Sequence, residues 1–216
     1  MMNERLLLRC ARILSAVFSP FYMTFAVFAF VLLHSFRRLL YVGFVPSVWG
    51  YLILLFMVAS FTIIIPRASI ALLRRMMKQS RWVMSQRQNR GIPYVMAILS
   101  YLACAIMLYT LKVPPYLQGV IVSSLVVLML CAVLNVWWKV SVHMAALGMV
   151  AAAAGVFGVA MNFNPLWFLC LLFLVSGAVG SSRMLLRQHT LPQVLWGFVL
   201  GVACSLYFFS KGFLMI

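Results

Sequence analysis

The chain consists of long apolar runs separated by short polar junctions. Seven of these runs are close to the length of about 20 residues that an α-helix needs to cross a bilayer. The pair Ser19–Pro20 interrupts the first run, and a proline inside a helix kinks it or delays its start. The pattern therefore predicts an all-α bundle of about six to seven transmembrane helices. The predicted spans are 13–34, 48–66, 92–111, 116–138, 144–161, 166–181 and 193–210.

The longest polar segment, residues 67–90, follows the second span. Its part from residue 68 to 78 is predicted to continue as a helix out of the membrane. Arg74, Arg75 and Lys78 would lie on one side of that helix. Basic amphipathic helices of this kind lie at the level of the lipid headgroups.

Small residues are concentrated in the last three spans. Gly148, Ala152 and Gly155 lie near one another on the fifth span, and Gly197 and Gly201 form a small-xxx-small pair on the seventh. Small side chains allow the backbones of two membrane helices to approach closely. We therefore expect tight packing that holds the adjoining polar junctions rigidly.

Composition supports a membrane protein and excludes a separate soluble domain. Of the 216 residues, 66% are apolar and only 8% are charged, which lies far outside the soluble range. We interpret residues 1–216 as a single integral membrane domain. Within it, 13–91 comprises the first two spans and the basic connector, and 92–216 forms the remaining helical core.

The charge balance excludes several kinds of chemistry. The chain has 17 Lys and Arg residues but one acid, Glu4. A magnesium site rich in Asp, paired-carboxylate catalysis and proton transport through buried acids all require more carboxylates. The five cysteines stand singly, without the spacing of a metal site. Since the cations lie between spans, we expect anionic membrane lipids as their partners rather than nucleic acid.

The order of spans places three polar junctions on one side of the membrane. Residues 67–90, 139–143 and 183–189 are separated from each other by two spans, and they share their side with the N-terminus. Most of the Lys and Arg residues lie on this side, so the positive-inside rule predicts that it is cytoplasmic in a multi-pass protein of the cell membrane. His34 falls on the opposite side and is interpreted as an interfacial residue without a catalytic role.

The three junctions together offer two histidines among cations. Guanidinium groups bind phosphate through paired hydrogen bonds and offset the charge of its oxygens during phosphoryl transfer. One imidazole could attack phosphorus while the other protonates the leaving alkoxide. The candidate residues are Arg87, Arg90, Lys139, Ser141, His143, Arg183, Arg187 and His189.

These residues resemble three motifs of the type 2 phosphatidic acid phosphatase and vanadium haloperoxidase superfamily. Ser182–Arg183, followed after five residues by His189, is similar to the third motif. Ser141-Val142-His143 looks like a reduced form of the second motif, Ser-Gly-His. The basic segment 87–93 stands where the first motif is expected. The resemblance to the membrane branch of the superfamily covers about residues 87 to 201.

The resemblance implies a role for each candidate residue. His189 would be the nucleophile that forms a phosphohistidine, and His143 would protonate the leaving group. No metal or other cofactor is needed for phosphatase activity in this family. The substrate would be a lipid phosphate or diphosphate. The residues implied to hold the phosphate are Arg183, with Arg90 or Arg87, Lys139 and Ser141.

The chain departs from the family pattern at several positions. The family has Asp four residues after the nucleophile, where this chain has Gln193, and its Pro-Ser-Gly is replaced by Val140-Ser141-Val142. The carbonyl oxygen of Gln193 could still orient the imidazole of His189, without the negative charge. The departures leave open a catalytically weak or inactive member that binds anionic lipid or supports a membrane complex. A small transporter is disfavoured, because no span carries an acid or a broken-helix substrate site.

Overall fold

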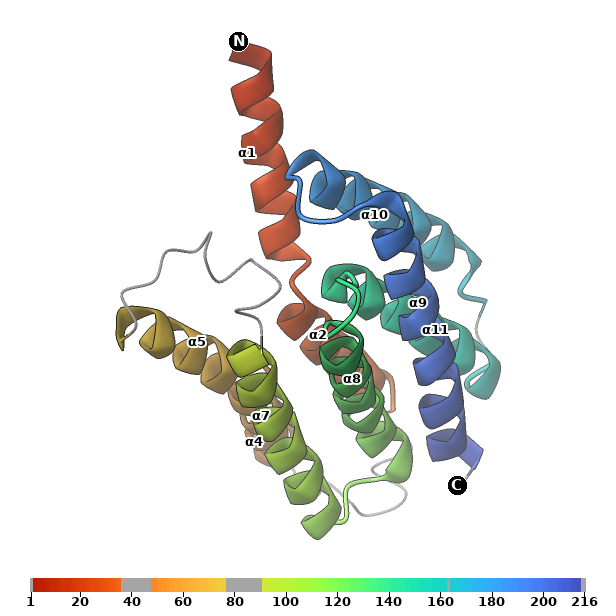
Figure 1. The fold of residues 1–216 in the computed structure, drawn as a ribbon. Coiled ribbons are helices and arrows are strands. Elements are labelled where there is room, and N and C mark those ends of the chain that lie inside the picture. The colour runs from red at the N-terminus through yellow and green to blue at the C-terminus, as the bar shows by residue number, and fades with distance from the viewer. Residues whose placement is uncertain (1, 36–47, 77–90, 163, 215–216) are drawn as a thin grey trace.

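The computed structural model describes residues 2–35, 48–76, 91–162 and 164–214. These residues form helices and connecting turns, without a strand among them (Figure 1). A π-helical turn, Ser60–Ile64, joins α4 to α5. The α-helices are α1 (Met2–Val17), α2 (Pro20–His34), α4 (Val48–Ala59), α5 (Ile65–Met76), α7 (Gly91–Thr110), α8 (Pro115–Leu134), α9 (Val142–Ala160), α10 (Leu166–Leu185) and α11 (Leu191–Leu214).

The predicted all-α membrane bundle is confirmed. Within the described ranges, six helices are long and apolar enough to cross a membrane, the first of them running from Val48 to Leu73 through α4, the π turn and α5. A seventh span is obtained if the pair α1 and α2, bent by 46°, is one broken span. Both counts lie within the six to seven spans expected from the sequence.

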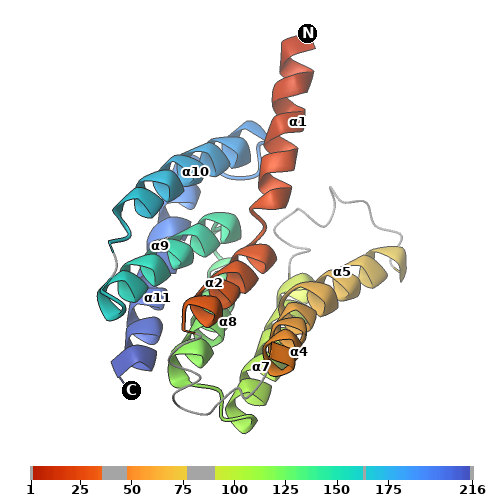
Figure 2. The same cartoon turned by 180° about the vertical axis from the view of Figure 1, so that it is seen from behind.

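The predicted break at Ser19–Pro20 divides the N-terminal region into two helices. Pro20 has no N–H group for the preceding turn and is the first residue of α2. In α1, Arg5, Arg9 and Arg12 are exposed, and the helix projects away from the bundle (Figure 2). The predicted first span, 13–34, therefore consists of α2 and only the last turn of α1.

The second span continues into the basic connector, as the sequence indicates. The π turn precedes Pro66, and the N–H of Ile65 bonds to the carbonyl oxygen of Ser60, five residues earlier. A proline cannot donate to the turn before it, and π-helix occurs mostly as single turns of this kind inside α-helices. Arg67 and Arg75 are exposed on α5. Lys78 lies outside the described residues.

Two predicted span ends differ from the structure in ways that affect the candidate site. The fourth span was expected to extend to Trp138, but α8 ends at Leu134 and residues 135–138 form a turn. The sixth was expected to end at Ser181, but α10 continues to Leu185. Arg183 therefore lies in the last turn of a helix instead of in a loop.

The closest helix pair is α9 with α11, and glycines make it possible. A Cβ added at Gly148 or Gly201 would overlap backbone atoms of the facing helix, and one at Gly197 would lie 2.6 Å from the carbonyl oxygen of Ser141. The expected close approach is thus confirmed for these three glycines. It is wrong for Gly155, whose added Cβ would meet nothing within 4 Å.

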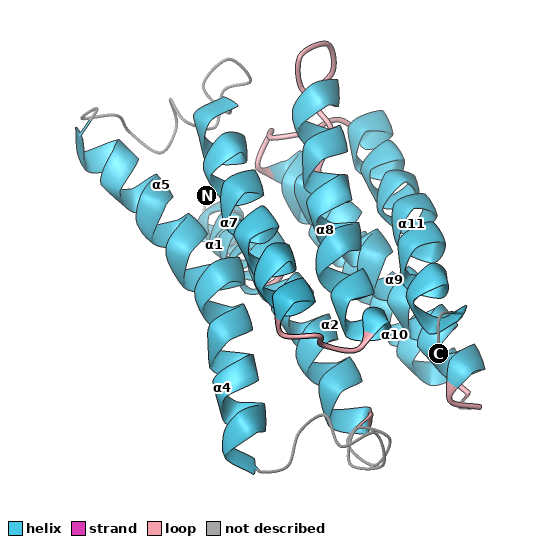
Figure 3. Cartoon of the chain, turned by 90° about the horizontal axis from the view of Figure 1, so that it is seen from below, coloured by secondary structure: helices cyan, strands magenta, loops and turns pink. Residues whose placement is uncertain are grey.

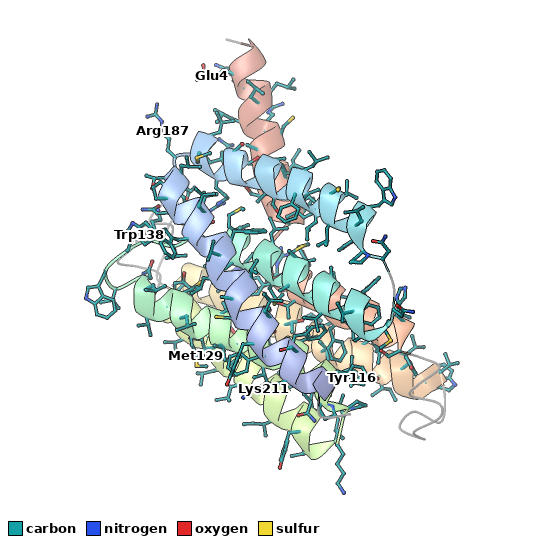
Figure 4. The ribbon with its side chains drawn as sticks, turned by 90° about the vertical axis from the view of Figure 1, so that its right-hand side faces the viewer. Glu4, Tyr116, Met129, Trp138, Arg187 and Lys211 are labelled. Atoms are coloured by element: carbon teal, nitrogen blue, oxygen red, sulfur yellow. The ribbon has the colours of Figure 1, made fainter. Side chains whose placement is uncertain are left out.

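The helix ends that carry the candidate residues lie at one end of the bundle. Figures 1 and 3 show the end of α5, the start of α7, the end of α8 and the start of α11 toward one end of the bundle, spread across its width, and the C-terminus toward the other end. In Figure 4, Trp138 and Arg187 lie away from Tyr116 and Lys211. The shared side expected from the order of spans agrees with this arrangement, whereas its cytoplasmic location stays a prediction.

Candidate functional site

The candidate site lies where α8 leads into α9 and α10 leads into α11. The first connection brings Lys139 and Ser141, and the second brings His189. Arg87 and Arg90, the two cations assigned to the first motif, lie outside the described residues. The described part of the site is therefore built from two connections that are far apart in the sequence.

The connection between α10 and α11 consists of two helix caps that enclose His189. Arg187 adopts a left-handed conformation with φ 52°. The N–H of Gln188 bonds to the carbonyl oxygen of Arg183 at 3.0 Å, and that of Arg187 bonds to Met184 at 2.8 Å. This pair of bonds is a Schellman motif, which terminates a helix in a fixed geometry.

The second cap begins α11 directly after His189. The backbone N–H of Thr190 donates to Oε1 of Gln193 at 3.2 Å, which is half of a capping box of the type Thr-x-x-Gln. The sequence Thr190-Leu191-Pro192-Gln193 carries the signal for this cap, a second role for Gln193 besides the one expected from its place in the third motif. Gln193 therefore caps the start of α11 and also faces the imidazole of His189.

His189 is 7% exposed, and its Nδ1 faces two carbonyl oxygens. Nδ1 lies 3.3 Å from Oε1 of Gln193 and 3.3 Å from the backbone oxygen of Lys139. The N–H of Thr190 fixes which end of the Gln193 amide is the oxygen. Since carbonyl oxygens only accept hydrogen bonds, the nitrogen that faces them must carry the hydrogen. In this tautomer the lone pair of the imidazole is on Nε2, the atom that a nucleophilic role requires.

Packing of α9 against α11 holds Ser141 beside Gln193. The backbone N–H of Ser141 donates to the carbonyl oxygen of Gln193 at 3.2 Å, and Gly197 lies against the carbonyl oxygen of Ser141. The side chain of Ser141 is fully buried, and its hydroxyl oxygen has no hydrogen-bond partner among the described residues. A buried hydroxyl in this state is one that a bound polar group could satisfy.

Arg183 and Lys139 are half-buried at this end of the bundle. Arg183 is fixed by the last turn of α10, and the backbone of Lys139 is fixed by its contact with His189. In the described part of the chain, no group of three or more His, Cys, Asp or Glu side chains could hold a metal ion. The chemical character of the site is cationic, with one imidazole of defined orientation.

His143 makes a contact that the sequence gave no reason to expect. Its Nε2 lies 3.1 Å from the backbone oxygen of Ser15, in the last turn of α1. Carbonyl groups in the last turn of a helix lack partners within the helix, so His143 stabilises the broken end of α1 and ties it to α9. The predicted acid thus has an observed structural contact, and its catalytic role stays a prediction.

His34 also makes local contacts, at the opposite end of α2. Its Nδ1 lies 3.0 Å from the carbonyl oxygen of Phe30, and its ring packs against Phe30 and Phe157. These contacts agree with the interpretation of an interfacial residue.

Comparison of the chain with protein-family models, curated proteins and solved structures gives no match.

Proposed function

We propose that this protein is an integral membrane lipid phosphatase that acts through a phosphohistidine at His189. The observation that supports it best is the orientation of this imidazole, whose Nδ1 faces Gln193 and Lys139. A nucleophilic histidine needs a partner at one ring nitrogen that fixes the tautomer, so that the other nitrogen carries the lone pair. The resemblance to the phosphatase superfamily assigns the same residue the same role.

The proposed reaction has two displacements at phosphorus. The lone pair on Nε2 of His189 forms a bond to phosphorus while the bond from phosphorus to the lipid oxygen breaks, and the leaving oxygen takes a proton from His143. Water then attacks phosphorus and gives a proton back to His143, the nitrogen–phosphorus bond breaks, and inorganic phosphate leaves. His143 would donate this proton as an imidazolium, either from Nδ1 while Nε2 keeps the carbonyl oxygen of Ser15, or from Nε2 after that contact breaks.

The cations supply the electrostatic part of this proposal. Charge on the phosphoryl oxygens is stabilised by guanidinium and ammonium groups that are already in place. Arg183 and Lys139 come from the two connections that meet at His189, and Arg87 and Arg90 would add to them. The charge distribution supports a site on the cytoplasmic side of the cell membrane, with a lipid phosphate or diphosphate as the substrate.

The test is release of phosphate from a panel of lipid phosphates by purified protein in detergent. His189→Ala should abolish release, whereas His34→Ala should retain it because the contacts of His34, with Phe30 and Phe157, lie at the end of α2 and α9 away from the candidate site. Trapping with a radiolabelled lipid phosphate should leave label on the wild-type protein and none on His189→Ala. Equal rates in wild type and His189→Ala would exclude His189 as the nucleophile.

A second candidate function is binding of anionic lipid without turnover. The observation that favours it is the neutral amide of Gln193, because the amide orients the imidazole but offers no charge to stabilise the imidazolium that forms. In this case the purified protein would bind phosphatidic acid vesicles but release no phosphate from any member of the panel.

A further inference from the structure

A wholly apolar groove runs between α2, α9 and α10. It encloses about 360 Å³, which is within the range of about 300–1,000 Å³ of small-molecule pockets. Every side chain that lines it is apolar. A groove without polar groups offers nothing to water or to a polar ligand, so its occupant must itself be apolar.

The groove opens sideways, where the bilayer would surround the bundle. Leu171 is 59% exposed and Phe168 is 44% exposed, and both line the groove on α10. Ala26 lines it on α2 and is also exposed. An aliphatic chain could therefore enter from the membrane without passing through water.

The two ends of the groove differ in their surroundings. At the end away from the candidate site, the rings of Phe30 and Phe168 stack with their centroids 6.3 Å apart. At the other end, the groove reaches Phe18, at the break between α1 and α2. Phe18 is three residues beyond Ser15, whose carbonyl oxygen faces His143.

The groove is lined by residues of α9 and α10, the two helices that carry His143 and Arg183. Val150 lines the groove seven residues after His143 on α9, a separation of about 10 Å along a helix. Val175 lines it eight residues before Arg183 on α10, or about 12 Å. The nearest lining residues of the groove therefore lie about 10–12 Å, measured along the same two helices, from His143 and Arg183.

We propose that this groove holds one aliphatic chain of an anionic lipid whose headgroup lies at Lys139 and Arg183, the described cations of the candidate site. This inference rests on the proposed function and adds the part of the substrate that the site would recognise: a long chain attached to a phosphate. Charge complementarity at one end and apolar contact along the groove select such a lipid over a neutral phospholipid or a short water-soluble phosphate. The exposed Arg12, in the last turns of α1, adds a further cation at the end that Phe18 occupies.

The experiment is photolabelling in nanodiscs of phosphatidylcholine. The probe is phosphatidic acid with a diazirine near the end of one acyl chain, and the labelled peptides are mapped by mass spectrometry. We expect label on α2, α9 and α10, with several-fold less label when unlabelled phosphatidic acid is added in excess. Excess phosphatidylcholine should not compete.

Two variants fill the groove, and a third serves as a matched control. Ala26→Leu and Ala154→Leu place larger side chains into its lining, and each should lower the labelling several-fold. Ala103→Leu makes the same change at an exposed alanine on α7, away from the groove, and should leave the labelling unchanged. Size-exclusion profiles identify any variant that does not fold, and the other groove variant then decides.

The outcomes separate this inference from the proposed function. Labelling that phosphatidylcholine competes equally, or that both groove variants leave unchanged, means contact with bulk lipid only and overturns the inference. Selective labelling without release of phosphate supports the groove and contradicts hydrolysis. Release of phosphate that is equal for long-chain and short-chain substrates in all variants supports hydrolysis and contradicts the groove.

Discussion

Replacement of Gly197 by alanine should separate α9 from α11 at the end that carries the candidate site. The added Cβ would lie 2.6 Å from the carbonyl oxygen of Ser141, whereas ordinary van der Waals contact begins at 3.4 Å. The obstructing atom belongs to the backbone, so no side-chain rotation relieves the overlap. The two helices must therefore move apart by the difference, about 0.8 Å.

This displacement acts on the contact that joins the two connections. The bond from the N–H of Ser141 to the carbonyl oxygen of Gln193 is 3.2 Å long, and adding the displacement stretches it to about 4.0 Å, beyond hydrogen-bonding range. Overpacking costs about 1–3 kcal/mol, and the lost hydrogen bond adds about 0.5–1.5 kcal/mol. Since a misplacement of 1 Å can cost about 10²-fold in rate, we expect phosphate release to fall by more than ten-fold.

The assay combines thermal unfolding in detergent with phosphate release. Gly155→Ala on α9 and Gly177→Ala on α10 are matched controls, because a Cβ at either position meets nothing within 4 Å. Alanine is favoured over glycine in a helix by about 1 kcal/mol, so the controls should unfold at the wild-type temperature or above it. Equal unfolding temperatures and rates for Gly197→Ala and the two controls would refute the proposed link between helix packing and the site.

Three further changes have defined outcomes. Gln193→Glu keeps the length of the side chain and the capping box, and its carboxylate should stabilise the protonated imidazole of His189. We expect phosphate release to become at least ten-fold faster. An unchanged rate would mean that the missing charge does not limit the reaction. His143→Leu removes the bond to the last turn of α1, so limited proteolysis should cut α1 faster, whereas an unaltered cleavage pattern would contradict the structural role. Arg67→Met removes both the hydrogen bond and the cation–π contact that Arg67 makes with Tyr22, the latter at 5.1 Å to the ring centroid. We expect the free energy of unfolding to fall by about 0.5–1 kcal/mol. Arg75 is another exposed cation on α5, and Arg75→Met should leave this free energy unchanged.

The local features of this protein follow from short stretches of its sequence. The apolar runs give the spans because the thickness of a bilayer sets the length of a helix that crosses it. The break between α1 and α2 follows from the missing N–H of Pro20. His189 and Gln193 stand one helical turn apart, so their contact was predicted from the sequence and is seen in the structure. The pattern Thr190-x-x-Gln193 could also have identified the cap.

The sequence could not decide which distant segments meet. The backbone oxygen of Lys139 contacts His189 across 50 residues, and His143 contacts Ser15 across 128 residues. In a bilayer, lipid chains are as apolar as the helix surfaces, so hydrophobicity does not choose the neighbour of a helix. Close fit of small residues chooses it instead, as at Gly197 and Gly201, and that fit depends on backbone positions in three dimensions. The sequence by itself therefore determined the helices and the candidate nucleophile. Because helix neighbours depend on this fit, only the tertiary structure decided the partner of His143 and the groove between α2, α9 and α10.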